Sequence, residues 1–259
     1  MIDIFINILI VHLIYFHIIA VTYDVWMHKG YFHDRLSFSK SFDHIGRFIM
    51  WTLGLGTFSQ WLRISAGTHR SHHRHSDTIE DSHSPHHISF LGILDNRFNP
   101  YFKRVTNQEL GQLATDVPDF DDWIQRNIYN GKFHWGWVVP ITLYAIFFGW
   151  VGLIAGIVLM IITNRLCMPM MAAWIPHKIG LYRHPKHKFP DKSLNLFPIG
   201  IYLSGGELHS NHHYDPQAIN LRMRWFEFDI SYWYIKLFEL LGFLKIKDRT
   251  TGWNNSLHK

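Results

Sequence analysis

The sequence predicts an all-α integral membrane protein whose helical cap, on the cytoplasmic side, carries a two-metal site made of histidine side chains. Two long apolar segments indicate the membrane part. The 20 histidines, as many as Asp and Glu together, indicate the metal site. No repeat, low-complexity tract or Gly/Ser linker divides the chain, so we expect a single domain over residues 1–259.

The composition excludes several other classes of protein. Hydrophobic residues make up 47% and aromatic residues 16%, which excludes a disordered chain. The one cysteine, Cys167, excludes a disulfide scaffold and any CxxC zinc or redox motif, and suits a reducing compartment. A net charge of +5 without long Lys/Arg runs supports nucleic-acid binding only weakly, whereas it suits contact with anionic lipid.

The first apolar segment covers residues 2–23. About 20 such residues span a bilayer, so we expect a membrane-spanning helix here. A signal peptide fits less well, because no basic region precedes the segment and no A-x-A-like site follows it.

The second apolar segment, residues 135–175, has three glycines near its middle, Gly149, Gly152 and Gly156. Its length predicts two short spans, 135–150 and 153–175, joined by a tight turn that returns the chain to its starting side. Arg165 lies within the second arm, where we expect it to snorkel or to face a polar interior.

Basic residues predict the orientation. No Lys or Arg precedes Lys29, and none lies between Phe133 and Asn164. By the positive-inside rule, residues 28–133 and 176–259 are then cytoplasmic. Residues 45–67 are apolar but flanked by arginines, and a single crossing there would put the histidine clusters on opposite sides. We therefore expect 45–67 to be interfacial or re-entrant. The alternative is a soluble helical protein with apolar core helices.

The histidines cluster with metal-ligand spacing. There is one HxxxxH motif, there are two HxxHH motifs, and one more histidine follows the apolar hairpin. On a helix, positions i, i+3 and i+4 share one face, so each HxxHH motif directs three imidazoles toward one point. Nine imidazoles suit two metal ions with room left for oxygen. The candidate ligands are His28, His33, His69, His72, His73, His177, His209, His212 and His213.

The ligand type narrows the choice of metal. Imidazole binds zinc, copper, iron or nickel, but a structural zinc site would close with four ligands and would usually include cysteine. We therefore expect a dinuclear redox centre with two iron ions. Asp77, Asp81 and Glu207 are candidates to accept hydrogen bonds from the ligand rings. Other histidines are expected to be packing or surface residues, while the roles of His75, His83, His86 and His87 stay open.

The order HxxxxH, HxxHH, HxxHH resembles that of the membrane fatty-acid desaturase family. Nearly the whole chain is similar to bacterial delta-9 acyl-lipid or acyl-CoA desaturases, notably in residues 80–85, 121–129, 195–200, 205–213 and 225–229. The resemblance implies that the nine histidines bind two irons, and that O2 and two electrons serve to introduce a cis double bond near carbon 9 of an acyl chain.

Two positions depart from the family pattern. Related enzymes often have an asparagine four residues before the isolated histidine, where this chain has Ala173. A water-mediated ligand from that position is then absent or comes from elsewhere. The third motif reads His209-Ser-Asn rather than His-Asn-Asn, which changes no ligand.

The resemblance also implies partners and location. No part of the chain resembles a cytochrome b5 domain or a GxGxxG nucleotide site, so the electron donor would be a separate ferredoxin, rubredoxin or cytochrome b5-like protein with its reductase. The substrate would be an acyl-lipid or acyl-CoA, and the active site would face the cytoplasm, at the inner membrane if the chain is bacterial. The alternatives are a hydroxylase or ketolase of the same superfamily, and a non-enzymatic membrane metal-binding or transport protein; a transporter favours ligands within its spans.

Overall fold

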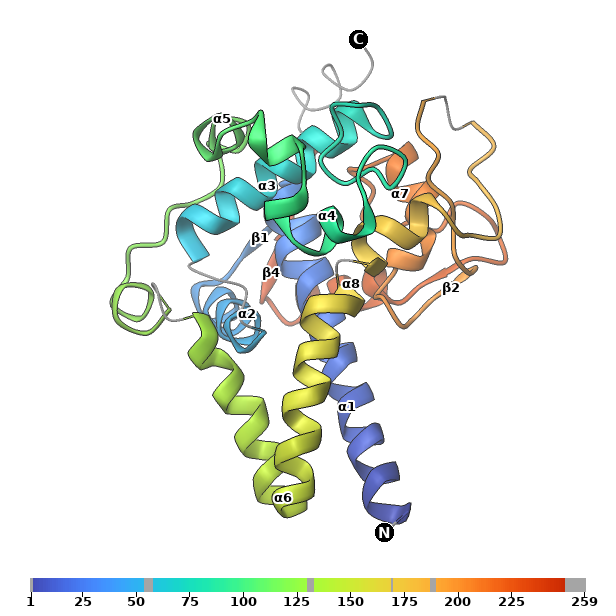
Figure 1. Ribbon diagram of the computed structural model, residues 1–259. Coiled ribbons are helices and arrows are strands. Elements are labelled where there is room, and N and C mark those ends of the chain that lie inside the picture. Colours follow the sequence, from blue (N-terminus) through green and yellow to red (C-terminus); the bar gives the residue numbers. More distant parts are fainter. Residues whose placement is uncertain (1, 54–57, 130–132, 169, 187–189, 250–259) are drawn as a thin grey trace.

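The computed structural model describes residues 2–53, 58–129, 133–168, 170–186 and 190–249. These residues are mostly helical. Helix α1 and the two arms of α6 form a narrow stalk, and the other elements form a wider cap at one end of it (Figure 1). The N-terminus and the turn of α6 lie together at the far tip of the stalk.

The elements follow in chain order. The α-helices are α1 (Ile2–Thr22), α2 (Lys40–Thr52), α3 (Phe58–His75), α4 (Phe90–Leu94), α5 (Asn107–Gln112), α6 (Val138–Ile162), α7 (His209–Tyr214) and α8 (Ile230–Leu240). The strands are β1 (Leu36–Phe38), β2 (Ile199–Gly200), β3 (Phe228–Asp229) and β4 (Leu244–Ile246). The π-helical segments are η1 (Tyr23–Phe32), η4 (Gln125–Tyr129), η6 (Thr163–Cys167) and η7 (Met170–Trp174), and the 3₁₀ segments are η2 (Asn96–Phe98), η3 (Tyr101–Lys103), η5 (Phe133–Trp137), η8 (Ile175–His177) and η9 (Gly206–Leu208).

The stalk consists of apolar helices with little protein around them. The helical stretches Ile2–Phe32 and Trp135–Cys167 are long and apolar enough to span a membrane. Only 28% and 17% of their most apolar windows are buried, whereas a core helix of a soluble protein is mostly buried. With 21 residues, α1 is about 31 Å long, close to the thickness of a bilayer core.

Helix α6 is a hairpin that turns at Gly149. This residue has φ 63° and ψ −148°, a conformation that is essentially restricted to glycine. The large side chains at the turn point outward, and Trp150 is 75% exposed. Inside the stalk, His12 of α1 joins both arms, because its Nδ1 lies 3.0 Å from Tyr144 Oη and its Nε2 lies 3.0 Å from Thr163 Oγ1. These bonds satisfy the polar groups of an otherwise apolar helix packing.

Arg165 lies near the cap end of the second arm. Its side chain is exposed, and its guanidinium lies 5.9 Å from the centre of the Trp137 ring. It therefore faces away from the interior of the stalk, and the alternative of a polar interior is wrong.

Residues 45–67 do not form a continuous helix. They cover the end of α2, residues 54–57, which lie outside the described part, and the start of α3. Helix α2 is amphipathic and lies where the stalk meets the cap (Figure 1). Ile45 and Phe48 are exposed on it, while Met50 is buried.

A buried apolar cluster holds the elements of the cap together. It includes Trp26 and Met27 of η1, Met50 of α2 and Leu62 of α3. The helix that carries the first HxxHH motif is thereby packed against the segment that carries HxxxxH.

The sequence predicted an all-α protein, but the structure also contains two small β-sheets. Strands β1 and β4 pair antiparallel, with Leu36 opposite Ile246, and β2 and β3 pair parallel, with Ile199 opposite Phe228. Each sheet has only two short strands and joins segments far apart in the chain, which no local sequence pattern reveals.

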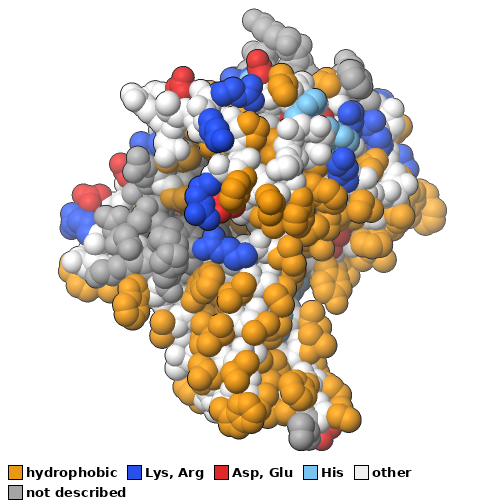
Figure 2. All heavy atoms as spheres, viewed as in Figure 1, with side chains coloured by type: hydrophobic (Ala, Val, Ile, Leu, Met, Phe, Trp, Pro, Cys, Tyr) orange, Lys and Arg blue, Asp and Glu red, His pale blue; other side chains and the backbone are white. Residues whose placement is uncertain are grey.

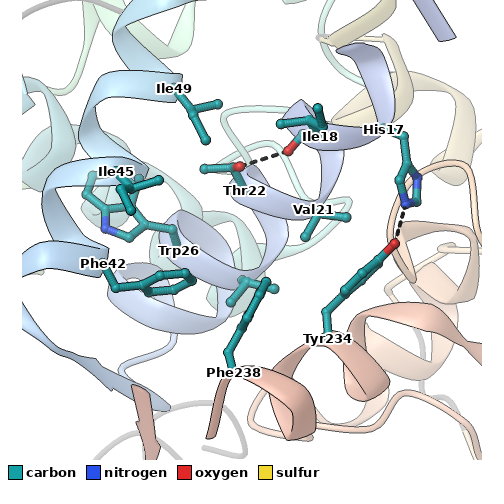
Figure 3. A pocket seen from close by; sticks show the side chains of 12 residues that line it. His17, Ile18, Val21, Thr22, Trp26, Phe42, Ile45, Ile49, Tyr234 and Phe238 are labelled. Atoms are coloured by element: carbon teal, nitrogen blue, oxygen red, sulfur yellow. Dashed lines mark hydrogen bonds between the residues drawn. The ribbon is translucent and has the colours of Figure 1, made fainter. Parts of the chain in front are cut away.

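An apolar pocket of about 330 Å³ lies beside α1 at the junction with the cap (Figure 3). Its walls come from α1 and η1, from α2 and from α8. At one side His17 Nε2 lies 2.9 Å from Tyr234 Oη, and Thr22 bonds to the carbonyl of Ile18, so these polar groups are satisfied within the protein.

Candidate metal centre

The HxxxxH motif depends on a π-helical turn. In an α-helix, residues five apart lie about 140° apart around the axis, too far for two imidazoles to meet. Here η1 continues α1, and the backbone N–H of His33 donates to the carbonyl of His28, the i to i+5 bond of a π-helix. This wider turn brings both rings to the same side of the segment.

The two HxxHH motifs lie on α-helices, as their spacing predicts. The expectation that each directs its three imidazoles toward one point is wrong, because each motif gives ligands to both of the groups described below. His69, His72 and His73 are in the last turns of α3. The second motif forms the short helix α7, which follows a tight turn with positive φ at Ser204 (54°) and Gly205 (91°). A Cβ at position 205 would lie 2.4 Å from Asp229 Oδ1, so this turn requires glycine.

The structure brings all nine candidate histidines together in two groups. Within each group the ligand atoms lie within 4.8 Å of one another. We call them the five-histidine group and the four-histidine group. The first comprises His28, His33, His69, His73 and His212, and the second comprises His72, His177, His209 and His213.

The five-histidine group has the form of a square pyramid. The Nε2 atoms of His28, His69, His73 and His212 form a closed ring with sides of 3.1, 3.1, 2.9 and 3.1 Å. The His33 ring lies at nearly equal distances, 4.8 to 5.0 Å between centroids, from all four. The ring centroids of His69 and His212, at opposite corners, are 6.0 Å apart. Among the described residues, no sixth His, Cys, Asp or Glu joins this group.

The four-histidine group is more open. His177 and His213 are 4.8 Å apart between ring centroids, and each lies 4.5 to 5.1 Å from the other two members, His72 and His209. This pattern matches an octahedron from which two neighbouring ligands are missing. The two groups adjoin, since the rings of His73 and His213 are 4.4 Å apart.

The nitrogen spacing fits six-coordinate metals. A metal about 2.1 Å from each nitrogen puts neighbouring nitrogens about 3.0 Å apart in an octahedral complex and about 3.4 Å apart in a tetrahedral one. The Nε2–Nε2 distances of 2.9 to 3.2 Å match the octahedral value. Iron, nickel and copper therefore suit these groups better than a tetrahedral structural zinc.

Hydrogen bonding between two neutral rings does not explain this packing. The Nε2 atoms of His72 and His213 lie 3.2 Å apart. Each ring has its Nδ1 against a carboxylate, Asp81 at 2.7 Å and Asp191 at 2.6 Å, which accepts a proton but has none to give. In the neutral rings the proton is then on Nδ1, and each Nε2 carries a lone pair that faces the other. A cation between them removes this repulsion, so the donor set fits a metal.

The protonation states also suit metal binding. Burial and the neighbouring imidazoles lower the pKa of most of the ligands well below the ordinary 6.5, so these rings are neutral at pH 7 and offer lone pairs. They are His33, His69, His73, His209 and His212. Burial also works against protonation of His72, but the Asp81 carboxylate beside it raises its pKa.

Carboxylates orient four of the rings. Asp81 lies 2.7 Å from His72 Nδ1 and Asp77 lies 2.8 Å from His177 Nδ1, the role expected for both. Burial alone would raise the pKa of Asp77, but His177 and the other donors lower it to about 2. Asp77 itself has a φ of 57°, which is uncommon for a residue other than glycine.

Two further carboxylates were not expected from the sequence. Asp24 accepts from His28 Nδ1 at 2.9 Å, and Asp191 lies 2.6 Å from His213 Nδ1. Asp24 is four residues before His28, a spacing that could have revealed it. Asp191 is 22 residues away from its partner, and no local pattern indicates it.

Glu207 does not hold a ligand ring. Its Oε1 accepts from the backbone N–H of Leu203 at 2.9 Å, and its Oε2 has no hydrogen-bond partner among the described residues. Burial raises the pKa of this carboxyl. The expected role is wrong because Glu207 belongs to the 3₁₀ turn before α7, which directs it toward the backbone of its own loop.

Three of the histidines left open, His83, His86 and His87, lie around the four-histidine group. His83 lies within reach of His72 and Asp81, and His86 Nε2 lies 3.0 Å from the carbonyl of His177. His87 contacts the carbonyl of Asp77, and His75 faces Glu80 at 3.5 Å. The side chain of Ala173 lies outside the described part, as do His187 and His258.

Comparisons with known proteins confirm the resemblance. No protein-family model matches the chain. It is 26% identical over 194 residues to an sn-1 stearoyl-lipid 9-desaturase from Synechocystis sp., covering 69% of this chain and 53% of that protein. It is 25% identical over 179 residues to an acyl-CoA 5-desaturase from Anemone leveillei, covering 68% and 52%. It is 24% identical over 234 residues to a hex-5-enoyl-[acyl-carrier protein] acetylenase from Moorena producens, covering 85% and 70%.

The chain spans about half the length of the first two of these relatives. Each match nevertheless covers two thirds or more of this chain. Together with the order HxxxxH, HxxHH, HxxHH, these similarities identify the chain as a relative of the fatty-acid desaturases.

Proposed function

We propose that this chain is a membrane fatty-acid desaturase, an O2-dependent oxidoreductase that introduces a cis double bond into an acyl chain. The observation that carries the proposal is the convergence of nine buried or half-buried imidazoles into two adjacent groups. Their nitrogen spacing suits octahedral metals, and three ligand positions are left open for oxygen or water.

Two iron ions, when bound, would supply the oxidation that removes two hydrogens from an unactivated CH2–CH2 pair. O2 would become two waters, with two electrons and two protons from the acyl chain and two of each from outside. The chain's own residues do the rest. The nine histidines hold the metals, and Asp24, Asp77, Asp81 and Asp191 fix the ring orientations by accepting their Nδ1 protons. The surrounding cap excludes water from the site.

The relatives' names support the reaction and a position for it. Two of the three named above are desaturases, of a stearoyl lipid at carbon 9 and of an acyl-CoA at carbon 5. Because the similarities quoted from this sequence are to delta-9 enzymes, we propose carbon 9 for this chain. The acyl carrier is a lipid or a thioester, and the relatives include both.

We propose that the stalk spans the membrane and that the cap lies on the cytoplasmic face. Figure 2 supports this: apolar side chains cover the stalk, whereas Lys and Arg side chains gather on the cap above it. The amphipathic helix α2 then lies in the interface, which keeps all nine histidines on one side.

We propose that the apolar pocket beside α1 holds part of a lipid hydrocarbon chain and not the reacting carbons (Figure 3). None of the nine histidines is among its lining residues. It borders the exposed apolar surface of α1, where Ile14 and Ile18 are half exposed.

We propose that electrons come from a separate protein. A ferredoxin, rubredoxin or cytochrome b5-like donor with its reductase would approach the cap, where Lys103, Arg104, Lys178 and Arg222 are exposed. Such basic residues attract an acidic partner, and anionic lipid headgroups as well.

The test is the acyl profile of membranes from an aerobic host that expresses the chain, measured by gas chromatography with mass spectrometry. We expect a new monounsaturated chain with its double bond at carbon 9. A hydroxylated chain would move the protein to the sister hydroxylases. Absence of both, in a host that supplies a donor able to support a known desaturase, would contradict the proposed reaction.

The orientation can be tested by labelling single cysteines in a Cys167→Ser background. Glu80 lies on the cap with 67% of its side chain exposed, and Trp150 lies at the stalk tip. In intact cells a membrane-impermeant maleimide should label Trp150→Cys, while Glu80→Cys should react only after the cells are opened. Labelling of both cysteines from the same side would contradict the orientation.

A further inference from the structure

A buried lysine contacts the support of the five-histidine group. Lys29 is 1% exposed, and its Nζ lies 2.9 Å from Asp24 Oδ2, while Asp24 Oδ1 accepts from His28 Nδ1. The carboxylate of Asp24 thus bridges a ligand ring and a buried ammonium.

The same ammonium reaches the start of α8, more than 200 residues further along the chain. Lys29 Nζ donates to Ser231 Oγ at 2.9 Å and lies 3.6 Å from Asp229 Oδ2. Ser231 also donates to Asp24. Asp229 in turn caps α8 by accepting from the Ser231 N–H, and it holds the backbone of Leu221 at 2.9 Å. All four side chains are buried.

In the four-histidine group, the rings of His72 and His177 are supported differently. Asp77 and Asp81 hold His177 and His72, and their other hydrogen bonds come from hydroxyl and backbone N–H groups. Within the described part of the chain, no lysine or arginine side chain forms an ion pair with either carboxylate.

We propose that Lys29 is a positioning residue for the five-histidine group: its ammonium fixes Asp24 against His28 and offsets the charge of that carboxylate. The inference rests on the metal centre proposed above, not on the reaction. Its consequence is that the carboxylate on His28 has an ammonium beside it, whereas no Lys or Arg of the described residues pairs with the carboxylates on His72 and His177.

The test is anaerobic titration of purified, iron-free protein with ⁵⁷Fe(II), read as bound iron and as Mössbauer spectra. Lys29→Met leaves two buried carboxylates uncompensated and can impair folding. The double variant Lys29→Met/Asp229→Asn removes one charge of each sign, and asparagine can still cap α8. Ser231→Ala is a milder change in the same network. Asp81→Asn, at the other group, is the matched control.

We expect wild-type protein to bind two irons that give two distinct quadrupole doublets. In the double variant, one iron should bind roughly 10- to 100-fold more weakly and its doublet should change, while the other doublet stays as in wild type. Ser231→Ala should affect the same doublet to a smaller degree. Asp81→Asn should weaken the other iron.

Two results would overturn the inference. One is wild-type affinity and unchanged doublets in the double variant, and the other is equal weakening of both irons there. Wild-type protein that binds two irons with this pattern of variants, but leaves acyl chains unaltered, would overturn the proposed reaction and leave the role of Lys29 standing.

Discussion

Replacing His212 with alanine is expected to abolish desaturation and to lower bound iron from two ions per chain to one or fewer. His212 is a corner of the ring of nitrogens, 3.1 Å from His28 and 2.9 Å from His73. Loss of a residue that only orients a ligand weakens metal binding about 10- to 100-fold, and loss of the ligand itself should cost more. Iron analysis of the purified variant and the acyl profile of its host measure both effects.

The matched control is His75→Ala. His75 lies on α3 only two residues beyond His73, but it belongs to neither group and about a third of its side chain is exposed. We expect this variant to keep both irons and its activity. Full activity of the His212 variant, or equal losses in the two variants, would contradict the assignment of His212 as a ligand.

Replacing Arg70 with methionine is expected to destabilise the cap by about 2–5 kcal/mol. Arg70 is buried between the ligands of α3, and its Nε donates to the carbonyl of Phe32 at 2.8 Å. Its two terminal nitrogens pair with both oxygens of Asp116, at 2.5 and 2.8 Å, and also donate to the carbonyls of Leu113 and Tyr31. The change removes one donor from the carbonyl of the buried Phe32 and from the carbonyls of the half-buried Tyr31 and Leu113.

Thermal unfolding of the iron-free protein measures this effect without interference from bound metal. A loss of that size should lower the melting temperature by roughly 5–15 °C. Arg70→Lys should recover only part of it, because an ammonium cannot match the bidentate geometry or reach all the carbonyls. If the melting temperature of the methionine variant equalled that of the wild type, the network would not stabilise the cap.

The spacing of the histidines predicted where the candidate ligands lie, because HxxHH on an α-helix is a local pattern. The division of these ligands into two groups could not be predicted from the sequence. His72 and His73 are neighbours in sequence yet belong to different groups, since adjacent helix positions point about 100° apart. Similarly, the rings of His28 and His33 come together only through a π-helical turn, and no pattern in residues 23–32 predicts that turn.

Residues that support the ligands were predicted less well. Asp77 and Asp81 lie within ten residues of the first HxxHH motif, and they were expected, whereas Asp191, Ser231 and the contacts of Arg70 come from distant segments. Such contacts follow from tertiary packing, for which one sequence offers no local signal. The two small sheets escaped prediction for the same reason.

The central claim, a two-iron centre held by nine imidazoles, is tested most directly by metal analysis with iron X-ray absorption spectroscopy of the purified protein. We predict two irons per chain, each six-coordinate, with nitrogen or oxygen neighbours at about 2.1 Å and no sulfur. Fewer than one iron per chain after anaerobic loading with Fe(II), or a four-coordinate zinc in its place, would contradict the account.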